Sequence, residues 1–218
     1  MSADLIILGA GGSSREILGA AEDINRREPQ WRVLGFLDDN PALLGKTVDG
    51  LPVLGPLAAA REHTAQLIVG IASWRKPGAR RDVVLRLGLP RERYATVIHP
   101  SASINSRVTI GVGTAILQNV VITSGSVVGD HVLISQNVTM AHDDAIGDFV
   151  TIASAAIITG GVRLRAGCYL GAGCTIMNGV TVNEGALVGI GSVVMIDVPA
   201  GVTVSGYPAR SIPQMKRP

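Results

Sequence analysis

The sequence has few aromatic residues and no long uncharged hydrophobic run. Aromatic residues make up 3% of its 218 residues, although 47% of the residues are hydrophobic. The core must therefore be built mainly from short aliphatic side chains, which suits a narrow and repetitive interior. Because a membrane-spanning helix needs about 20 consecutive apolar residues, we expect no membrane insertion.

Charge and cysteine are also sparse. The net charge is +2, and the basic residues are scattered apart from the 75–76 and 80–81 pairs and a tail at Lys216–Arg217. Nucleic-acid binding needs a denser basic face, so we expect no nucleic-acid partner. Cys168 and Cys174 are expected to be small, reduced core residues rather than a disulfide or a metal site. The sequence does not open on a signal-peptide pattern, and we expect a soluble cytoplasmic protein.

What the sequence does contain is an unbroken period of six. Every sixth residue from Ile104 to Val194 is aliphatic, which is neither a helical nor an ordinary strand pattern. Gly111, Gly129 and Gly147 are spaced 18 residues apart, so three hexapeptides make one coil. We expect about five coils to stack as a triangular prism with the aliphatic side chains pointing inward.

The repeat contains one irregular position. A small or β-branched residue follows four positions after each aliphatic residue from 104 to 176, except at Asp144, which lies two residues from His142. An unpaired charge in an inward-facing position is costly, so Asp144 should have a partner. The irregular position indicates where chemistry takes place.

Residues 1 to about 95 alternate between strand and helix patterns, which predicts a parallel sheet with helical crossovers. Strands are expected at residues 5–8, 33–37, 67–71 and 95–98, and helices at residues 15–25 and 74–87. Ser13 or Ser14 is expected to cap the first helix.

A glycine-rich turn over residues 9–14 follows the first strand. It has Ser14 where the dinucleotide fingerprint has a third glycine, and about 95 residues are too few for a complete dinucleotide site. One interpretation is a plain strand-to-helix turn. The other is a site for one nucleotide, in which glycine amides at the helix N-terminus face phosphate and Asp38 or Asp39 binds a base or ribose.

The repeat and the closing segment VSGYPAR at residues 204–210 resemble the hexapeptide-repeat acyltransferases, whose fold is a left-handed parallel β-helix. LGAGG at residues 8–12, FLDDN at 36–40, IHPSA at 98–102, AHD at 141–143 and IGD at 146–148 narrow the resemblance. The chain resembles bacterial sugar acetyltransferases that N-acetylate nucleotide-linked amino sugars, and the related sialic acid O-acetyltransferases. The predicted fold is a Rossmann-like α/β half domain with a parallel sheet, residues 1–98, that binds a nucleotide sugar. An all-β left-handed parallel β-helix with a C-terminal tail follows over residues 99–218.

The resemblance implies an acetyl-CoA-dependent homotrimer with each active site between neighbouring helices and with His142 as the general base. The residues point to the same histidine, because acyl transfer needs a base that takes a proton near neutral pH. His63 is expected on a solvated surface, His99 in a turn and His131 exposed. The family pattern places the carboxylate that orients His142 at Asp143, and Asp144 is the alternative.

The resemblance also implies ligand-binding positions. Relatives often have histidine in the places of Ser13 and Thr151. At position 151 the contact with acyl-CoA therefore falls to the Thr151 hydroxyl or to backbone. Ala172 and Ile190 would line the pantetheine groove. No metal is expected, because His131 and His142 alone are too few ligands. The predicted substrate-binding residues are Gly11, Gly12, Ser13, Asp38, Asp39, Ala72 and Ser73.

We therefore expect an acyltransferase that transfers acetyl from acetyl-CoA to the amine of a nucleotide-linked amino sugar by direct attack. The expected sugar is a 4-amino-4,6-dideoxyhexose destined for a surface glycan. Two alternatives stay open: a sugar O-acetyltransferase of the sialic acid type, and a non-catalytic β-helix scaffold. The sequence leaves open the nucleotide base, the sugar stereochemistry and the length of the acyl chain.

Overall fold

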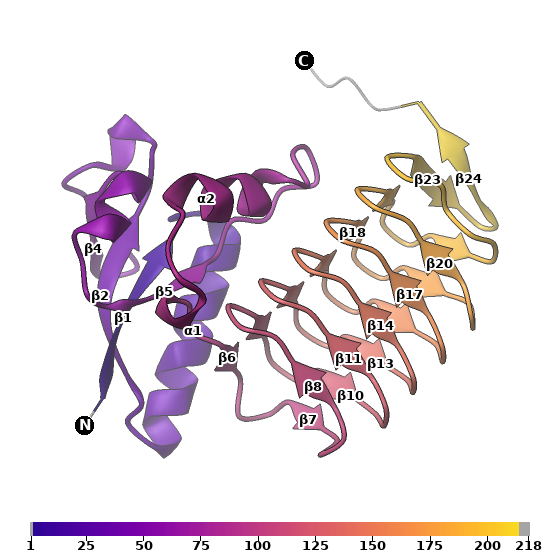
Figure 1. The fold of residues 1–218 in the computed structure, drawn as a ribbon, viewed down its shortest axis with the longest axis horizontal. Helices are drawn as coiled ribbons and strands as arrows, with labels where there is room; N and C mark the ends of the chain where they lie inside the picture. Colours follow the sequence, from indigo (N-terminus) through magenta and orange to yellow (C-terminus); the bar gives the residue numbers. More distant parts are fainter. Residues whose placement is uncertain (1, 214–218) are drawn as a thin grey trace.

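A computed structural model describes residues 2–213 and shows an α/β part beside a prism of short strands that continues to the C-terminal end (Figure 1). Lys216–Arg217 of the expected tail lie outside the described residues. Within the described part of the chain, no helix is long and apolar enough to cross a membrane.

The N-terminal part is built on a five-stranded sheet in the order β3-β4-β2-β1-β5. Its strands are β1 Ala3–Leu8, β2 Trp31–Leu37, β3 Thr47–Val48, β4 Leu51–Gly55 and β5 Gln66–Val69. The predicted parallel arrangement is confirmed for β1 with β2 and β5, and for β2 with β4. The antiparallel β3–β4 hairpin was not predicted from the sequence, although its Asp49-Gly50 turn, in which both residues have positive φ, is a known hairpin signal.

Two α-helices and three short 3-10 helices complete this part. They are α1 Gly12–Arg27, α2 Ala79–Leu87, η1 Pro41–Leu43, η2 Leu57–Arg61 and η3 Arg91–Arg93. Helix α2 is shorter than the predicted 74–87 because Gly78, directly after Pro77, is its N-cap, and it ends at Gly88 in the left-handed conformation.

The predicted serine cap of the first helix is wrong. The N-cap of α1 is Gly11, and no side chain caps it. Ser14 instead faces inward and is fully buried. A Cβ on Gly70 would lie 2.3 Å from the Ser14 Oγ, and one on Gly9 would lie 3.1 Å from it. Glycine at these two positions therefore lets the start of α1 lie directly on the strand ends.

The C-terminal part is the expected prism of three sheets, which we name by their strands. The β7–β22 sheet has the order β22-β19-β16-β13-β10-β7, the β8–β20 sheet has the order β20-β17-β14-β11-β8, and the β6–β24 sheet has the order β24-β23-β21-β18-β15-β12-β9-β6. The strands are β6 Val97–Ile98, β7 Ser103–Ile104, β8 Thr109–Ile110, β9 Ala115–Ile116, β10 Val121–Ile122, β11 Val127–Val128, β12 Leu133–Ile134, β13 Thr139–Met140, β14 Ala145–Ile146, β15 Thr151–Ile152, β16 Ile157–Ile158, β17 Arg163–Leu164, β18 Tyr169–Leu170, β19 Thr175–Ile176, β20 Thr181–Val182, β21 Leu187–Val188, β22 Val193–Val194, β23 Thr203–Gly206 and β24 Ala209–Ile212.

From β6 to β19, each prism strand pairs in parallel with the strand three places later, as Val121 of β10 does with Thr139 of β13. This spacing confirms three hexapeptides per coil. The repeating aliphatic side chains form one continuous buried core along the prism. Cys168 and Cys174 belong to this core as free thiols, as expected, and burial raises the pKa of both.

The two parts share a hydrophobic interface. Ile17 and Leu18 of α1 belong to the same buried cluster as Ala115, Leu117 and Leu133 of the first coils. Strand β6 was expected in the N-terminal sheet, but it pairs with β9 and so starts the prism. The predicted boundary between residues 98 and 99 stays a prediction. The N-terminal part thus packs on the first coils, where a strand edge would otherwise be exposed.

Truncation of an inward aliphatic side chain should destabilise the protein strongly. Ile152 is fully buried in the prism core, whereas Leu85 on α2 is 65% exposed. We expect Ile152→Ala to lower the free energy of unfolding by about 2–5 kcal/mol, and Leu85→Ala to change it by about 0.5 kcal/mol or less. Chemical denaturation at equal protein concentration measures both values, and similar losses for the two variants would contradict the inward-facing assignment.

Candidate active site

His142 and Asp143 form a pair in the turn between β13 and β14. The His142 Nδ1 lies 2.9 Å from the Asp143 Oδ2, and the two side chains are 63% and 72% exposed. An ionised carboxylate can only accept hydrogen bonds, so Nδ1 donates and Nε2 keeps its lone pair. The pair therefore presents a ring nitrogen that can take a proton.

Backbone contacts to the coils on both sides hold this turn. The Asp143 amide donates to the Ser124 carbonyl at 3.0 Å, and the His142 carbonyl accepts from the Gly161 amide at 2.9 Å. Asp143 adopts a φ of 60°, a left-handed conformation that aspartate tolerates better than most residues. The side chains of the pair thus project from a turn that is bonded above and below.

Two glycines provide the space around the pair. A Cβ on Gly160 would lie 2.7 Å from the His142 Cε1, and a Cβ on Gly125 would lie 2.3 Å from the Asp143 Oδ1. Neither glycine was predicted from the sequence. Gly160 lies 18 residues after His142 and Gly125 lies 18 residues before Asp143, so the coil period was the signal that could have found them.

Asp144 points into the prism and is 1% exposed. Its Oδ1 accepts from the Val162 amide at 2.8 Å, and its own amide donates to the Ser126 Oγ at 3.2 Å. Among the described residues its Oδ2 has no hydrogen-bond partner. Burial raises the pKa of Asp144 to about 6, against the opposing effects of the Val162 amide and of His142. The partner expected for Asp144 is thus a backbone amide, and Asp143 is the carboxylate in contact with His142.

The structure brings the predicted substrate-binding residues to one edge of the N-terminal sheet. They follow three adjacent parallel strands, β1, β2 and β5, so they lie at the carboxyl ends of these strands. Ligands of open α/β sheets bind at such an edge. The residues are Gly11, Gly12 and Ser13 after β1, Asp38 and Asp39 after β2, and Ala72 and Ser73 after β5.

The two aspartates at this edge already bond to backbone amides. Asp38 accepts from the Ala10 amide and from the Asn40 amide, each at 2.8 Å. Asp39 accepts from the Leu57 amide at 2.9 Å. Asp38 therefore ties the glycine-rich turn to the end of β2, so the two strand ends hold one arrangement.

Thr151 lies at the interface between the two parts of the chain. It is 5% exposed, and its Oγ1 accepts from the Arg80 Nη2 at 2.8 Å. The predicted thioester contact needs an accessible hydroxyl. The burial of this hydroxyl and its bond to Arg80 therefore disfavour that role.

Ala172 and Ile190 lie one above the other on successive coils, where the Gly191 amide donates to the Ala172 carbonyl at 2.9 Å. Ile190 is 78% exposed. Both residues lie at the corner between the β6–β24 and β7–β22 sheets, whereas His142 lies at the corner between the β7–β22 and β8–β20 sheets. One protomer therefore does not bring them together.

The expectation that His131 is exposed is wrong. His131 is 6% exposed and stacks on Phe149 with ring centroids 5.2 Å apart. It also forms a T-shaped contact with Tyr94, with ring centroids 4.7 Å apart. Tyr94 comes from the N-terminal part and covers the turn that would otherwise be open. Burial is the largest effect on the pKa of His131 and lowers it.

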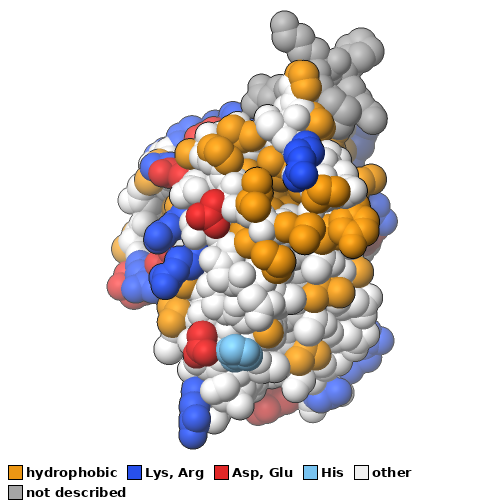
Figure 2. Space-filling model, turned by 90° about the vertical axis from the view of Figure 1, so that its right-hand side faces the viewer, with side chains coloured by type: hydrophobic (Ala, Val, Ile, Leu, Met, Phe, Trp, Pro, Cys, Tyr) orange, Lys and Arg blue, Asp and Glu red, His pale blue; other side chains and the backbone are white. Residues whose placement is uncertain are grey.

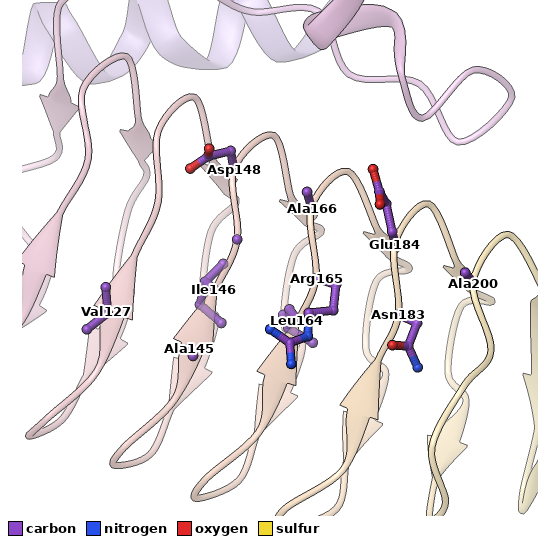
Figure 3. Close-up of a pocket in the computed structure, with 11 residues that line it drawn as sticks. Val127, Ala145, Ile146, Asp148, Leu164, Arg165, Ala166, Asn183, Glu184 and Ala200 are labelled. Atoms are coloured by element: carbon purple, nitrogen blue, oxygen red, sulfur yellow. The ribbon is translucent and has the colours of Figure 1, made fainter.

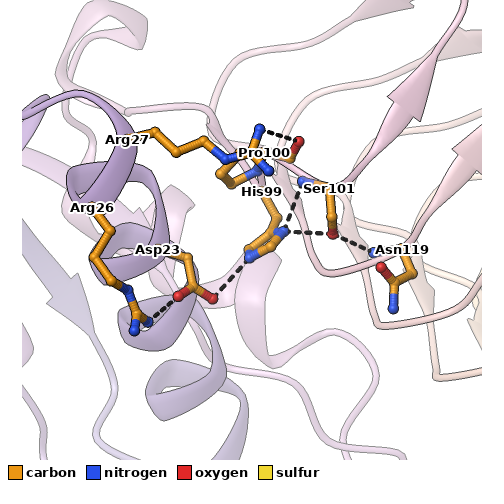
Figure 4. A network of polar contacts seen from close by, with 7 residues as sticks. All are labelled: Asp23, Arg26, Arg27, His99, Pro100, Ser101 and Asn119. Atoms are coloured by element: carbon orange, nitrogen blue, oxygen red, sulfur yellow. Dashed lines mark hydrogen bonds and ion pairs between the residues drawn. The ribbon is translucent and has the colours of Figure 1, made fainter.

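His99 has a larger role than that of a simple turn residue (Figure 4). It is 8% exposed, its Nε2 lies 2.9 Å from the Asp23 Oδ2, and its Nδ1 lies 2.7 Å from the Ser101 Oγ. Ser101 in turn accepts from the Asn119 amide at 2.9 Å. This network joins α1 to the first two coils.

An open groove of about 660 Å³ lies over the β8–β20 sheet, with Asp148 and Glu184 on one rim (Figure 3). Its lining includes neither His142 nor any other residue predicted for the site. Within residues 2–213, no group of three or more His, Cys, Asp or Glu side chains is arranged to hold a metal ion.

The buried Asp144 carboxyl should make stability depend on pH. Its folded pKa of about 6 lies above the ordinary value of about 3.9. The protonated carboxyl therefore makes its full contribution to folding stability below about pH 4, and this contribution is lost as the pH rises through about 6. Asp144→Asn keeps a neutral side chain, so the variant should gain up to about 3 kcal/mol relative to wild type between pH 4 and pH 7.5. Unfolding curves at equal protein concentration measure this, and a pH-independent difference would contradict it.

Comparison with known proteins supports both parts of the fold. Residues 4–83 match the PglD N-terminal domain family. A comparison with curated protein sequences finds no significant match. Among solved structures, the acetyltransferase domain of PglB from Neisseria gonorrhoeae is 27% identical with a TM-score of 0.82, over 97% of this chain and 100% of that chain.

Two further solved structures are similar over nearly their whole length. PerB from Caulobacter crescentus, in complex with CoA and GDP-perosamine, is 28% identical with a TM-score of 0.83, over 96% of this chain and 97% of that chain. WeeI from Acinetobacter baumannii is 28% identical with a TM-score of 0.79, over 95% of this chain and 99% of that chain. These likenesses confirm the predicted Rossmann-like half domain and left-handed β-helix. The chain is thus an acyltransferase whose fold is similar to that of left-handed β-helix sugar acetyltransferases, and its residues 4–83 match the PglD N-terminal domain family.

Proposed function

We propose that this protein transfers an acetyl group from acetyl-CoA to the amine of a nucleotide-linked amino sugar, with His142 as the general base. The exposed His142–Asp143 pair carries the proposal. The similar structures support it, because PerB is solved with CoA and GDP-perosamine and the PglB domain with acetyl coenzyme A. We infer a 4-amino-4,6-dideoxyhexose as the sugar and a surface glycan as its destination.

The reaction is a direct attack without a covalent enzyme intermediate. The Nε2 of His142 takes a proton from the amine as the amine nitrogen bonds to the thioester carbonyl carbon. Asp143 accepts from Nδ1, which fixes the tautomer and stabilises the imidazolium that forms. His142 then returns the proton to the sulfur as the carbon–sulfur bond breaks, which yields the amide and the free thiol.

The substrates bind at different places on the molecule. The amides at the start of α1, together with the positive end of the helix dipole, provide a phosphate-binding position. Asp38 and Asp39 follow β2, and Ala72 and Ser73 follow β5, at the same edge of the sheet. We assign the nucleotide to this edge of the sheet.

The pantetheine chain is assigned to the corner of Ala172 and Ile190, which is not the corner of His142. The active site is then complete only between two neighbouring chains, which fits the homotrimer that the resemblance implies. Hydrophobic side chains gather over the C-terminal coils (Figure 2), and such exposed patches commonly mark protein interfaces. The exposed large apolar residues there are Met177, Ile190, Met195, Ile196 and Tyr207.

Removal of the base should slow turnover without unfolding the protein. We expect His142→Asn to lower kcat by about 10²–10⁴-fold and to leave the melting temperature and the oligomeric state unchanged, because the ring is exposed. His63→Asn, at a half-exposed histidine of the N-terminal part, is the matched control. Wild-type turnover in His142→Asn would remove His142 from the mechanism.

A substrate panel tests the reaction itself. The protein and acetyl-CoA would be mixed with UDP-, GDP- and dTDP-linked 4-amino sugars and with free sialic acid, and thiol release would be measured. We expect release with at least one nucleotide-linked amino sugar. Release with sialic acid alone would indicate the O-acetyltransferase, and no release with any of them would favour the non-catalytic scaffold.

A further inference from the structure

Arg80 on α2 is a buried cation without an acidic partner. Its residue exposure is 2%, and none of the ion pairs found among residues 2–213 includes it. Its guanidinium donates four hydrogen bonds to uncharged acceptors. They are Nε to the Ile71 carbonyl at 3.1 Å, Nη1 to the His131 carbonyl at 2.7 Å and the Val150 carbonyl at 3.3 Å, and Nη2 to the Thr151 Oγ1 at 2.8 Å.

Such a group is costly to bury. Removal of a charge from water without a counter-ion is unfavourable, even where hydrogen bonds replace the lost hydration. Burial lowers the pKa of Arg80 to about 10, which still leaves it protonated at neutral pH. Three carbonyls and one hydroxyl satisfy the planar fork of the guanidinium from several directions, which the compact ammonium of lysine cannot reproduce.

The four acceptors belong to two different parts of the chain. Ile71 lies between β5 and the predicted substrate residues Ala72 and Ser73, whereas His131, Val150 and Thr151 belong to the coils. One side chain therefore connects the substrate edge of the sheet to the prism.

Ile71 also contacts the other side of this edge. A Cβ on Gly9 would lie 2.7 Å from the Ile71 Cγ1, so Ile71 lies directly against the glycine-rich turn. Asp38 holds the same turn through the Ala10 amide. A shift of Ile71 would therefore disturb the ends of β5 and β1 together.

We propose that Arg80 is a positioning residue, which fixes the substrate edge relative to the coils so that a bound sugar amine is placed against His142 of the same or a neighbouring chain. The inference rests on the proposed function for its effect on turnover. Reaction requires the two reacting atoms to be about 3–3.5 Å apart, and a misplacement of about 1 Å can cost about 10²-fold in rate.

Arg81 provides a matched control one position along the same helix. Its side chain is 52% exposed, and its Nη1 lies 3.2 Å from the Glu184 Oε1, so it also connects α2 to the coils. Exposed ion pairs of this kind contribute little. Arg81→Met thus removes a cation and an interdomain contact without touching the buried fork.

Steady-state kinetics of Arg80→Met, Arg80→Lys and Arg81→Met test the proposal. We expect both Arg80 variants to lose about 10²-fold in kcat/KM for the nucleotide-linked sugar, while the KM for acetyl-CoA stays within about twofold and Arg81→Met behaves as wild type. Restoration of activity by lysine would show that charge rather than geometry matters, and would overturn the proposal. So would an equal loss in Arg81→Met.

Thr151→Val tests the same contact if the Arg80 variants do not fold. It removes only the acceptor of Nη2, with little change in side-chain volume. A several-fold loss in kcat/KM for the sugar with an unchanged KM for acetyl-CoA supports the proposal. A raised KM for acetyl-CoA alone would instead support the thioester contact predicted for Thr151 and would overturn the positioning role.

Amide hydrogen exchange gives a readout that does not depend on catalysis. In Arg80→Met, residues 70–76 should lose protection while the coil core around residues 150–176 keeps it, and Arg81→Met should match wild type. If the wild-type protein acetylates none of the sugars, the proposed function fails while this measurement still decides whether Arg80 holds the edge. Unchanged protection of residues 70–76 in Arg80→Met would overturn that role.

Discussion

In the prism, backbone amides of each coil donate to carbonyls of the next coil, as the Val121 amide does to the Val138 carbonyl at 2.9 Å. These bonds repeat without a shift of register, so residues 18 positions apart lie above one another. The surroundings of His142 follow from this constraint, because Gly160 lies over the ring and Gly125 lies under the neighbouring carboxylate. The same stacking supplies the Val162 amide that the buried Asp144 needs. A one-dimensional spacing thus determines a three-dimensional site.

The same constraint explains how much could be predicted from the sequence. The period of six predicted the three sheets and the inward side chains, and the single irregular position pointed to the turn of His142. The period carries no information on contacts between the two parts of the chain. His131 was therefore expected to be exposed, although Tyr94 covers it, and Thr151 was assigned to a ligand, although Arg80 binds it from 71 residues away. The β3–β4 hairpin was missed because β3 has only two residues and the LPVLG sequence of β4 does not alternate between apolar and polar residues.

The interface between the two parts combines an apolar contact with two buried polar contacts, and exposed ion pairs such as Arg81–Glu184 also cross it. The apolar contact places α1 against the first coils. The polar contacts are the His99 network at the end of α1 and the Arg80 fork at the start of α2. Buried polar groups are satisfied only in a narrow range of geometries, so these contacts specify one relative orientation of the sheet edge and the prism. The groups that bind and the groups that react are thereby held on a common frame, although they lie far apart in the sequence.

The uniform coil also limits how the length of this protein can change. One residue added to a coil would turn the following strand over and expose its aliphatic side chains, whereas a complete coil could be added without disturbing any register. A coil inserted between the levels of His142 and Ile190 would move those levels apart by one strand spacing, about 4.8 Å. A coil added beyond Ile190 would leave their separation unchanged. Evolution can therefore lengthen this molecule toward its C-terminal end more freely than through its middle.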